Sequence, residues 1–263
     1  MMNILVTGSS GFIGKNLIKQ LKKINNINIL KFTRKNNIID LKNLIKESDF
    51  IMHLAGEVRP DSLSTDFENS NTLLTKNIIE VLEKQGKTIP ILLVSSIHAK
   101  VQKNDYGKTK RKAEILVEEY SKKSGSNCFI YRLPHVFGEG CKANYNSVIS
   151  TWIYNSINNL EINVFDRSIK MHYVYVQDII AEFITTIEQK NIGELYIEPK
   201  NIYETTLGEV IDFINEFKKN INNSKYSIFE SKFKQKLFNT YNEYYRQDLI
   251  DAKWYNYYSE KSI

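Results

Sequence analysis

The chain has 263 residues, of which 42% are hydrophobic and 25% charged. These ordinary proportions exclude a disordered, collagenous or coiled-coil protein, and no apolar run approaches the roughly 18 residues that a membrane-spanning helix needs. The net charge of +6 comes from lysines scattered along the chain rather than from a basic stripe. This pattern argues against nucleic acid as the partner and suits a smaller anionic ligand such as a nucleotide.

The cysteine content and the N-terminus indicate the cellular setting. Only two cysteines occur, Cys128 and Cys141, which is too few for a disulfide scaffold. Residues 1–7 lead straight into a glycine turn and lack the basic-then-apolar layout of a signal peptide. We therefore expect a reduced, cytoplasmic setting. The spacing of the histidines and cysteines predicts no metal site.

Short apolar runs alternate with helical patterns through the first two thirds of the chain. The runs predict strands at residues 3–7, 29–32, 50–54, 91–94 and 128–132, with helices between them at residues 12–24, 67–84 and 106–122. Such β-α-β alternation is typical of the α/β class with a parallel, doubly wound sheet. We expect this sheet to form the core of the protein.

The regular alternation weakens after Pro134. The pattern predicts a loop leading into a helix at residues 143–157, a strand at 171–176 and a helix at 178–189. Thr206 and Glu209 form a capping pair that opens a helix at 207–217. Further on, apolar residues recur at helical spacing, which predicts a helix packed on the body of the protein. These residues are Phe229, Phe233, Leu237, Tyr241 and Tyr244.

A glycine-rich turn joins the first strand to the first helix and reads T-G-S-S-G-F-I-G over residues 7–14. Gly8 permits a sharp turn, Gly11 permits close approach to a pyrophosphate, and Gly14 permits close packing of helix and strand. The helix start then offers unpaired N–H groups to phosphates. The turn therefore predicts a dinucleotide site, to which Ser10, Phe12 and Ile13 also contribute.

The end of the second strand commonly selects the cofactor. A carboxylate there binds the ribose hydroxyls of NAD, whereas an arginine accommodates the 2′-phosphate of NADP. The chain has Arg34 and Lys35 at this point and no carboxylate. We therefore expect NADP, as NADPH or NADP⁺, with Arg34 at the phosphate. Asp40 and Leu41 are expected to border the adenine.

Tyr106 and Lys110 lie four residues apart on one face of the third predicted helix. A free tyrosine has a pKa of about 10, and a fixed ammonium beside it favours the phenolate and lowers that pKa. Tyr196 and Lys200 share the spacing, but Pro199 lies between them in a strand-like segment. The strand before Tyr106 ends in Ser95 and Ser96, and a serine hydroxyl there is suited to hydrogen-bond a reacting carbonyl.

The glycine turn, the serine pair and Tyr-x-x-x-Lys, in this order, resemble the extended short-chain dehydrogenase/reductase family. The resemblance covers nearly the whole chain and implies an enzyme with a Rossmann domain, a nicotinamide cofactor and a nucleotide-sugar substrate. It also implies that Ser96, more than Ser95, is the catalytic serine. Tyr106 then matches the acid/base, and Lys110 matches the residue that holds the cofactor ribose and tunes the tyrosine.

Two further segments carry the resemblance. His-Leu-Ala-Gly at residues 53–56 matches the segment after the family's third strand and adds Leu54, Ala55 and Gly56 to the expected cofactor contacts. R-L-P-H-V-F-G at residues 132–138 matches a later family segment and adds Leu133 and Pro134. His135 stands where the family usually has Asn, at an expected substrate contact.

Part of the chain is similar to the reductase half of CapF-type capsular polysaccharide enzymes. The matching segments are residues 53–60 (H-L-A-G-E-V-R-P), 131–138, 144–147 (N-Y-N-S) and 206–209. The likeness implies reduction of the 4-keto group of a UDP-2-acetamido-2,6-dideoxy-hexose with NADPH, giving an L-talose-type sugar for surface polysaccharide biosynthesis. Expected substrate contacts are Arg59, Ser95, His135, Asn144, Asn146 and Arg167.

The chain also departs from these enzymes. They carry a metal-containing cupin domain, whereas all four histidines here precede residue 173 and no residues remain for a second barrel, so we expect either a stand-alone reductase or a truncated form of a longer protein. We expect an NADP-binding Rossmann domain at 1–165 and a smaller, mainly substrate-binding portion at 166–263, with residues 171–190 packing back on the Rossmann core. Family likeness also implies a homodimer through helices 67–84 and 106–122.

Three alternative functions remain open from the sequence. The first is a nucleotide-sugar 4-epimerase or dehydratase, in which the nicotinamide is recycled. The second is a 4-reductase of a dTDP- or GDP-linked 4-keto-6-deoxy-hexose. The third is a dinucleotide-binding sensor with an idle site, which the intact Ser96, Tyr106 and Lys110 disfavour.

Overall fold

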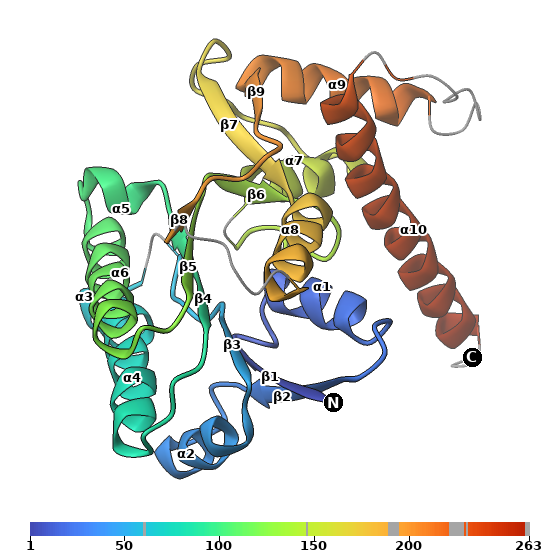
Figure 1. The fold of residues 1–263 in the computed structure, drawn as a ribbon. Coiled ribbons are helices and arrows are strands. Elements are labelled where there is room, and N and C mark those ends of the chain that lie inside the picture. Colours follow the sequence, from blue (N-terminus) through green and yellow to red (C-terminus); the bar gives the residue numbers. More distant parts are fainter. Residues whose placement is uncertain (60–61, 146, 189–194, 221–228, 230, 261–263) are drawn as a thin grey trace. The chain divides into compact units, whose positions relative to one another are not determined.

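The computed structural model describes residues 1–59, 62–145, 147–188, 195–220, 229 and 231–260, and it consists of two compact units (Figure 1). Unit 1 contains Met1–Pro134 and Gln177–Lys200, and unit 2 contains His135–Val176 and Asn201–Ile263. The units therefore do not divide at residue 165, where the sequence placed a boundary. The chain leaves unit 1 after Pro134, returns to it, and leaves it again.

Unit 1 is built on a six-stranded parallel sheet, which confirms the doubly wound α/β class. In chain order its strands are β1 (Met2–Thr7), β2 (Ile27–Phe32), β3 (Phe50–His53), β4 (Ile91–Ser96), β5 (Cys128–Leu133) and β8 (Tyr196–Ile197). Their order across the sheet is β2-β1-β3-β4-β5-β8. Because all strands run the same way, the residues that follow them gather at one edge of the sheet.

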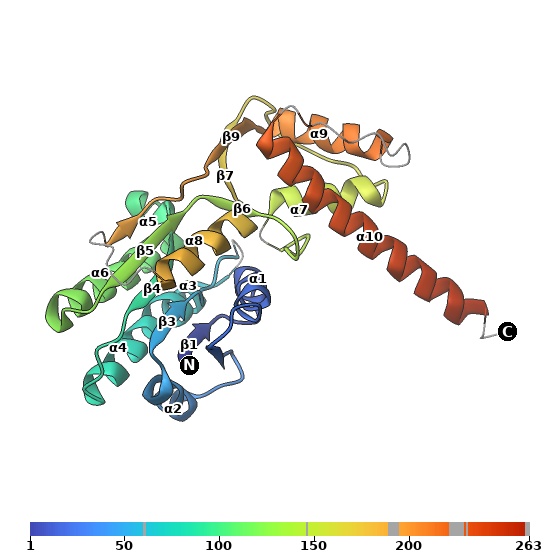
Figure 2. The same cartoon turned by 45° about the vertical axis from the view of Figure 1, so that its right-hand side comes forward.

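Helices cover both faces of this sheet (Figures 1 and 2). One face packs against α2 (Ile38–Glu47), α4 (Leu74–Lys84) and α6 (Asp105–Ser124), and alternate strand residues such as Leu5, Ile51 and Leu93 enter that core. The other face packs against α1 (Phe12–Leu21) and α8 (Val176–Glu188). On that face the Tyr131 ring lies 4.9 Å from the Phe183 ring, measured between centroids.

The predicted helix at residues 67–84 consists of three consecutive elements. A short helix α3 (Ser64–Phe67) runs into a π-helical turn η1 (Glu68–Leu73), and α4 follows directly. A π-helical turn inserts an extra residue into the helix and is frequent at functional sites. The sequence pattern also missed α2 and the four-residue helix α5 (His98–Val101).

In its described residues, unit 2 combines a small sheet with three helices. Its strands β6 (His135–Phe137), β7 (Lys170–Tyr175) and β9 (Tyr203–Thr206) lie in the order β6-β7-β9. Its helices are α7 (Val148–Ile157), α9 (Leu207–Asn220) and α10 (Lys232–Glu260).

Two predictions about unit 2 are confirmed. Thr206 and Glu209 form the expected capping pair, each side chain accepting a hydrogen bond from the other residue's backbone N–H. Phe233, Leu237 and Tyr241 are buried in the core of this unit, and Phe229 and Tyr244 pack against it.

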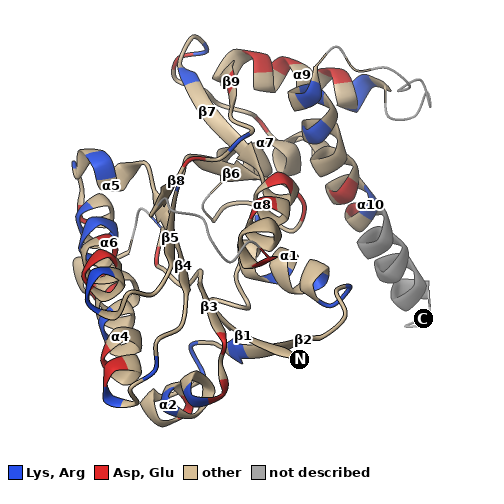
Figure 3. Ribbon diagram, viewed as in Figure 1, with Lys and Arg blue, Asp and Glu red and all other residues tan. Residues whose placement is uncertain are grey.

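Charged residues of both signs lie along α4 and α6 (Figure 3). In the part of the chain that the structure describes, no helix is long and apolar enough to cross a membrane. The same residues contain no group of three or more His, Cys, Asp or Glu side chains placed to hold a metal ion.

Candidate functional site

The glycines of the turn after β1 let its backbone pack closely against the segment after β3 and against the start of α1. Gly8 has a φ of +68°, and a Cβ on it would lie 2.7 Å from the backbone nitrogen of Ala55. A Cβ on Gly14 would lie 2.2 Å from the carbonyl oxygen of Gly8. Helix α1 starts directly after Gly11, with no side-chain cap and no acidic residue in its first turn. This helix start therefore suits an anionic group.

The segment after β3 is fixed to the glycine turn through a buried histidine. Thr75 donates to the backbone oxygen of Asn71, so His53 Nε2–H donates to Thr75 Oγ1 at 2.9 Å. The other ring nitrogen then accepts from Thr7 Oγ1 at 2.7 Å, and Thr7 in turn accepts from the backbone N–H of Ala55. Burial and then the Lys110 charge lower the pKa of His53 to about 3. His53 is therefore a neutral structural residue.

Asn71, on the π-helical turn η1, joins the segment after β3 to helix α6. Its Oδ1 accepts from the backbone N–H of Glu57 at 3.0 Å. Its Nδ2 donates to the backbone oxygen of Glu57 and to Thr109 Oγ1, each at 3.2 Å. A Cβ on Gly56 would lie 2.6 Å from Asn71 Oδ1 and 3.4 Å from Lys110 Nζ. Gly56 thus lets the segment lie against the helix that carries Tyr106 and Lys110.

Arg34 and Arg59 both pair with Glu57. Glu57 Oε2 accepts from an Arg34 guanidinium nitrogen at 2.8 Å, and Glu57 Oε1 accepts from Arg59 Nε at 3.1 Å. The Glu57 side chain is 3% exposed and that of Arg34 is 75% exposed. Arg34 therefore lies at the end of β2, where a 2′-phosphate site was expected, and is anchored by a carboxylate that the motif reading did not identify.

The placement of Asp40 and Leu41 does not support their expected contact with adenine. Leu41 is only 1% exposed and belongs to the core under α2. The Asp40 carboxylate accepts from the backbone N–H of Asn37 at 3.0 Å and so forms the capping box of α2. Leu41 thus packs beneath α2, and Asp40 caps the start of α2.

The predicted Ser-Tyr-Lys set lies at the carboxyl edge of the sheet. Ser96 ends β4, and its Oγ accepts from the backbone N–H of His98 at 3.2 Å, while Tyr106 lies in the first turn of α6. Lys110 is 4% exposed, and its Nζ donates to the backbone oxygen of Val94 at 2.7 Å. The Tyr106 ring also lies between the rings of His98 and Phe67, at centroid distances of 5.8 and 6.0 Å.

The protonation of this set differs from the sequence expectation in one respect. Burial raises the pKa of Tyr106, and the hydrogen bond with Ser96 offsets that rise only in part. The expected lowering by Lys110 does not dominate, because the ammonium is directed at the carbonyl of Val94. Burial lowers the pKa of Lys110 to about 8, opposed by the nearby Glu114 carboxylate.

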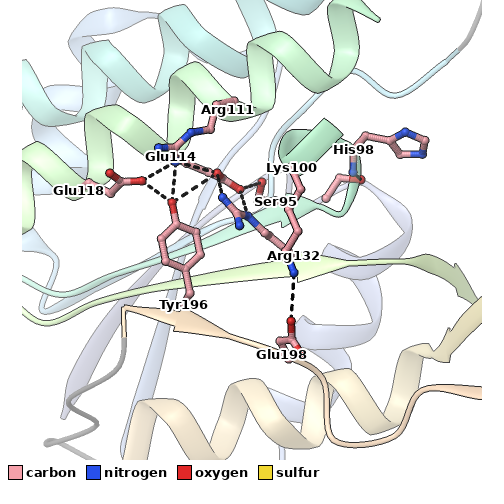
Figure 4. Close-up of polar contacts among 10 residues, drawn as sticks. Ser95, His98, Lys100, Arg111, Glu114, Glu118, Arg132, Tyr196 and Glu198 are labelled. Carbon is pink, nitrogen blue, oxygen red and sulfur yellow. Dashed lines mark hydrogen bonds and ion pairs between the residues drawn. The ribbon is translucent and has the colours of Figure 1, made fainter. Parts of the chain in front are cut away.

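Ser95, expected at the substrate, points to the opposite face of the sheet from Ser96, as consecutive residues of a strand do. Its Oγ donates to Glu114 Oε1 at 2.6 Å (Figure 4). Glu114 is fully buried and receives Arg132 through two hydrogen bonds, at 2.9 and 2.6 Å, and Arg111 at 3.0 Å. Ser95 therefore belongs to this buried ionic cluster, and its role as a substrate contact is corrected.

The remaining expected cofactor residues of unit 1 lie near the carboxyl edge. Leu133 pairs in register with Ser96, and its carbonyl oxygen accepts from the backbone N–H of Ile97 at 3.1 Å. Pro134 follows as the last residue of this part of unit 1. Leu54 and Ala55 line the back of the Gly8 turn.

The other expected substrate contacts belong to unit 2. The exposed His135 ring lies 5.9 Å from the Tyr173 ring, between centroids. Asn144 has a φ of +54°, and its backbone N–H donates to Thr151. Arg167 pairs with Asp212 at 2.7 Å and donates to the carbonyl oxygen of Gly208. Asn146 lies outside the described residues.

Three contributors to this region were missed by motif reading. Glu57, Asn71 and Glu114 are all buried polar residues that bind other polar groups. Glu57 lies within the segment that carried the resemblance, and Glu114 follows Lys110 by one further helical turn, so its spacing was visible. Asn71 carried no readable signal, because the π-helical turn shifts it out of the ordinary helical pattern.

Comparisons with known proteins agree with this geometry. A model of the family described as "NAD dependent epimerase/dehydratase family" matches residues 4–197. A UDP-2-acetamido-2,6-beta-L-arabino-hexul-4-ose reductase from Pseudomonas aeruginosa is 34% identical over 249 residues, which cover 94% of this chain and 66% of the relative.

Solved structures give the same relationship. The capsular polysaccharide assembling protein CapF from Staphylococcus aureus superimposes with a TM-score of 0.81 at 35% identity, covering 92% of this chain and 65% of CapF. The chain thus spans about two thirds of the length of both relatives. UDP-glucuronic acid 4-epimerase from Bacillus cereus, solved with NAD, has a TM-score of 0.78 over 92% of this chain and 98% of the epimerase. At 18% identity that likeness shows the fold alone.

Proposed function

Because the chain belongs to the NAD dependent epimerase/dehydratase family, the extended short-chain dehydrogenases/reductases, we propose that it reduces the 4-keto group of a UDP-2-acetamido-2,6-dideoxy-hexose with NADPH. The product would be an L-talose-type sugar nucleotide for a surface polysaccharide. The observation that carries the proposal is the Ser96–Tyr106–Lys110 set beside the glycine turn, in a chain 34% identical to a hexul-4-ose reductase.

The residues at the carboxyl edge fit a nicotinamide dinucleotide. The glycine turn leaves no room for a Cβ at Gly8 or Gly14, and the uncapped start of α1 is suited to the pyrophosphate. Arg34 supplies a guanidinium at the end of β2, which supports NADPH over NADH. When bound, the cofactor supplies the hydride; the chain supplies orientation and the proton.

The proton step is assigned to Tyr106. Ser96 holds the carbonyl oxygen of the sugar through its hydroxyl, and Tyr106 donates its phenolic proton to that oxygen as the C–O bond becomes a hydroxyl. Because burial raises the pKa of Tyr106, the residue is protonated at neutral pH and is poised to donate. An epimerase or dehydratase begins by removing a proton from a hydroxyl, which requires the phenolate.

Lys110 supports the same step electrostatically. Its buried ammonium, with a pKa of about 8, remains mainly charged at neutral pH. It is held by the carbonyl of Val94 and lies close to Gly56, so it is fixed before a ligand arrives. In the proposal it binds the cofactor ribose and stabilises negative charge that develops on the tyrosine oxygen.

Replacing Tyr106 by Phe tests the proposal. The variant Tyr106→Phe should keep NADPH binding and lose about 100- to 10,000-fold in turnover, because only the proton donor is removed. The measurement is NADPH consumption with freshly generated UDP-4-keto-6-deoxy-HexNAc, followed by NMR of the product. Tyr154→Phe, at a half-exposed tyrosine of α7, is the matched control. Unchanged turnover in Tyr106→Phe would remove the assignment.

The same assay separates the alternatives. Net oxidation of NADPH is expected for a reductase, whereas an epimerase or dehydratase returns its nicotinamide to the starting state. Consumption with a dTDP- or GDP-linked 4-keto-6-deoxy-hexose, but not with the UDP sugar, would keep the chemistry and change the substrate.

The proposal includes substrate contacts by Arg59, His135, Asn144, Asn146 and Arg167, and a homodimer through α4 and α6.

A further inference from the structure

Glu57 is a buried carboxylate close to the cofactor edge that the proposed proton and hydride steps do not use. It follows β3, and its partner Arg34 follows β2. These two strands flank β1, whose end carries the glycine turn. The pair is therefore formed by two loops that lie on either side of the expected pyrophosphate site.

The hydrogen-bonding capacity of Glu57 is filled by the protein. Oε1 accepts from the backbone N–H groups of Val58 and Arg59 at 3.0 and 3.1 Å, and from Arg59 Nε at 3.1 Å. Oε2 accepts from Arg34 at 2.8 Å and from a terminal nitrogen of Arg59 at 3.2 Å. A carboxylate offers about four acceptor sites. Glu57 is thus not available to bind the ribose hydroxyls of NAD, the usual role of a carboxylate at this edge.

The cluster of Glu57, Arg34 and Arg59 carries one negative and two positive charges, and so remains cationic. Arg34 gives only one of its terminal nitrogens to Glu57, although a guanidinium offers five N–H donors in a planar fork. Its side chain is 75% exposed. The other donors of Arg34 are therefore left for a ligand at the surface, and a guanidinium can bind a phosphate through two hydrogen bonds.

We propose that Glu57 is the positioning residue for Arg34, and that it thereby sets the preference for a cofactor carrying a 2′-phosphate. This inference rests on the proposed NADPH-dependent function. An exposed arginine samples many rotamers, and holding it on a buried carboxylate removes that freedom before the phosphate binds. Arg59 compensates the charge of Glu57, so the carboxylate orients Arg34 without cancelling the positive charge that the phosphate needs.

The protonation of Glu57 agrees with this role. Burial alone would raise its pKa, but the hydrogen bonds from Arg59, from the two backbone N–H groups and from Arg34 lower the pKa to about 2. Glu57 is therefore charged, and able to hold Arg34, throughout the pH range in which cofactor binding is measured.

The test is the affinity of purified Glu57→Gln for NADPH and NADH, measured by cofactor fluorescence, and for 2′,5′-ADP and 5′-AMP by calorimetry. We expect about tenfold weaker binding of NADPH and 2′,5′-ADP, and less than about twofold change for NADH and 5′-AMP, because a charged hydrogen bond that orients the phosphate donor is lost. If Glu57 acted only as a nearby negative charge, the same substitution would tighten NADPH binding. The two readings therefore predict opposite signs.

Arg34 provides the second half of the experiment. Arg34→Ala should abolish the preference for 2′-phosphorylated ligands, and Arg34→Ala/Glu57→Gln should bind NADPH no more weakly than Arg34→Ala alone. Glu57→Asp keeps the charge but shortens the side chain, and it should lose part of the affinity for NADPH. This variant replaces Glu57→Gln in the experiment if Glu57→Gln folds poorly. Glu47→Gln, at an exposed position of α2, is the matched control.

The outcomes separate this inference from the proposed function. The role of Glu57 alone is overturned if the native protein prefers NADPH and Glu57→Gln keeps that preference. It is also overturned if Glu57→Gln weakens the binding of NADPH and NADH equally. A native protein that prefers NADH, or binds neither cofactor, overturns the proposed NADPH-dependent function and the inference with it. These ligand measurements need no sugar substrate, so a wrong choice of sugar does not affect them.

Discussion

Single side chains at the carboxyl edge of the sheet are held in defined protonation states by burial. Tyr106 is kept protonated, His53 neutral, and Lys110 mainly charged at neutral pH with its pKa lowered to about 8. The neutral state of His53 and the lowered pKa of Lys110 follow from burial rather than from residue type. The Tyr-x-x-x-Lys spacing indicated the pair, but it could not show that the ammonium of Lys110 is directed at Val94.

His53 should make stability depend on pH. Its folded-state pKa of about 3 lies below the ordinary value of 6.5, so its contribution is fully present above pH 6.5 and is lost as the pH falls toward 3. The slope is up to about 1.4 kcal/mol per pH unit. Urea unfolding between about pH 7 and pH 5.5 should show a shallower dependence in His53→Gln than in the native chain. Parallel curves would mean that His53 is not held neutral.

Among the helices and strands, the π-helical turn η1 links the segment after β3 to helix α6. It directs Asn71 at the backbone of Glu57 and at Thr109 of α6, and Phe67, at the end of the preceding helix α3, packs on the Tyr106 ring. The segment that positions Arg34 and the helix that carries Tyr106 are therefore braced by one element. Substitutions in η1 should therefore affect both cofactor binding and the position of the catalytic residues.

Asn71→Ala tests this bracing. The substitution leaves the N–H and C=O groups of Glu57 without their partner, and we expect a loss of about 1–3 kcal/mol in unfolding free energy together with weaker NADPH binding. Asn69→Ala, at an exposed position of the same turn, should change neither quantity. Denaturant unfolding and fluorescence titration measure both. Equal behaviour of the two variants would show that η1 does not brace the site.

The sequence predicted elements where a local pattern was long enough to be read. Five of the six strands of unit 1 follow short apolar runs in the sequence, four of them largely buried, and the Gly8–Gly14 turn indicated the start of the first helix. Strand β8 has two residues and β6 has three, too short for any periodicity. The side chains of Ser95 and Leu41 are directed into the protein, because strand alternation and helix burial, not motif position, decide which way a side chain points.

On the scale of the whole molecule, the chain forms unit 1 from two separated stretches, and the Glu114 cluster joins them. Tyr196 of β8 donates to Glu118, and the Arg132 guanidinium lies 4.2 Å from the Tyr196 ring centroid. Lys100 adds an ion pair with Glu198 at 3.1 Å (Figure 4). The late strand is thus fixed to α5, α6 and β5 by charged groups, where two residues of pairing would hold it weakly.

Glu114→Ala should destabilise unit 1 severely. Removing one partner of a buried ionic cluster costs about 3–5 kcal/mol, and here Arg132 would lose its two hydrogen bonds to Glu114 while Arg111 would keep its pair with Glu118. Arg132 and Arg111 would be left facing each other at 18% and 27% exposure. Glu119→Ala, on the exposed side of the same helix, should change stability by less than about 0.5 kcal/mol. Thermal and urea unfolding compare the two, and similar values would contradict a stabilising role for the cluster.

The divided course of the chain has a consequence during translation. Residues 2–133 leave the ribosome first and can form five strands of the parallel sheet at once. The outer edge of β5 then stays open until Tyr196 and Ile197 have been synthesised. Unit 2 can complete its fold only later, because β9 and α9 emerge after β8 and α10 emerges last. An open strand edge is prone to pairing with other chains, so the interval between residues 133 and 197 is the period in which the nascent chain most needs a chaperone.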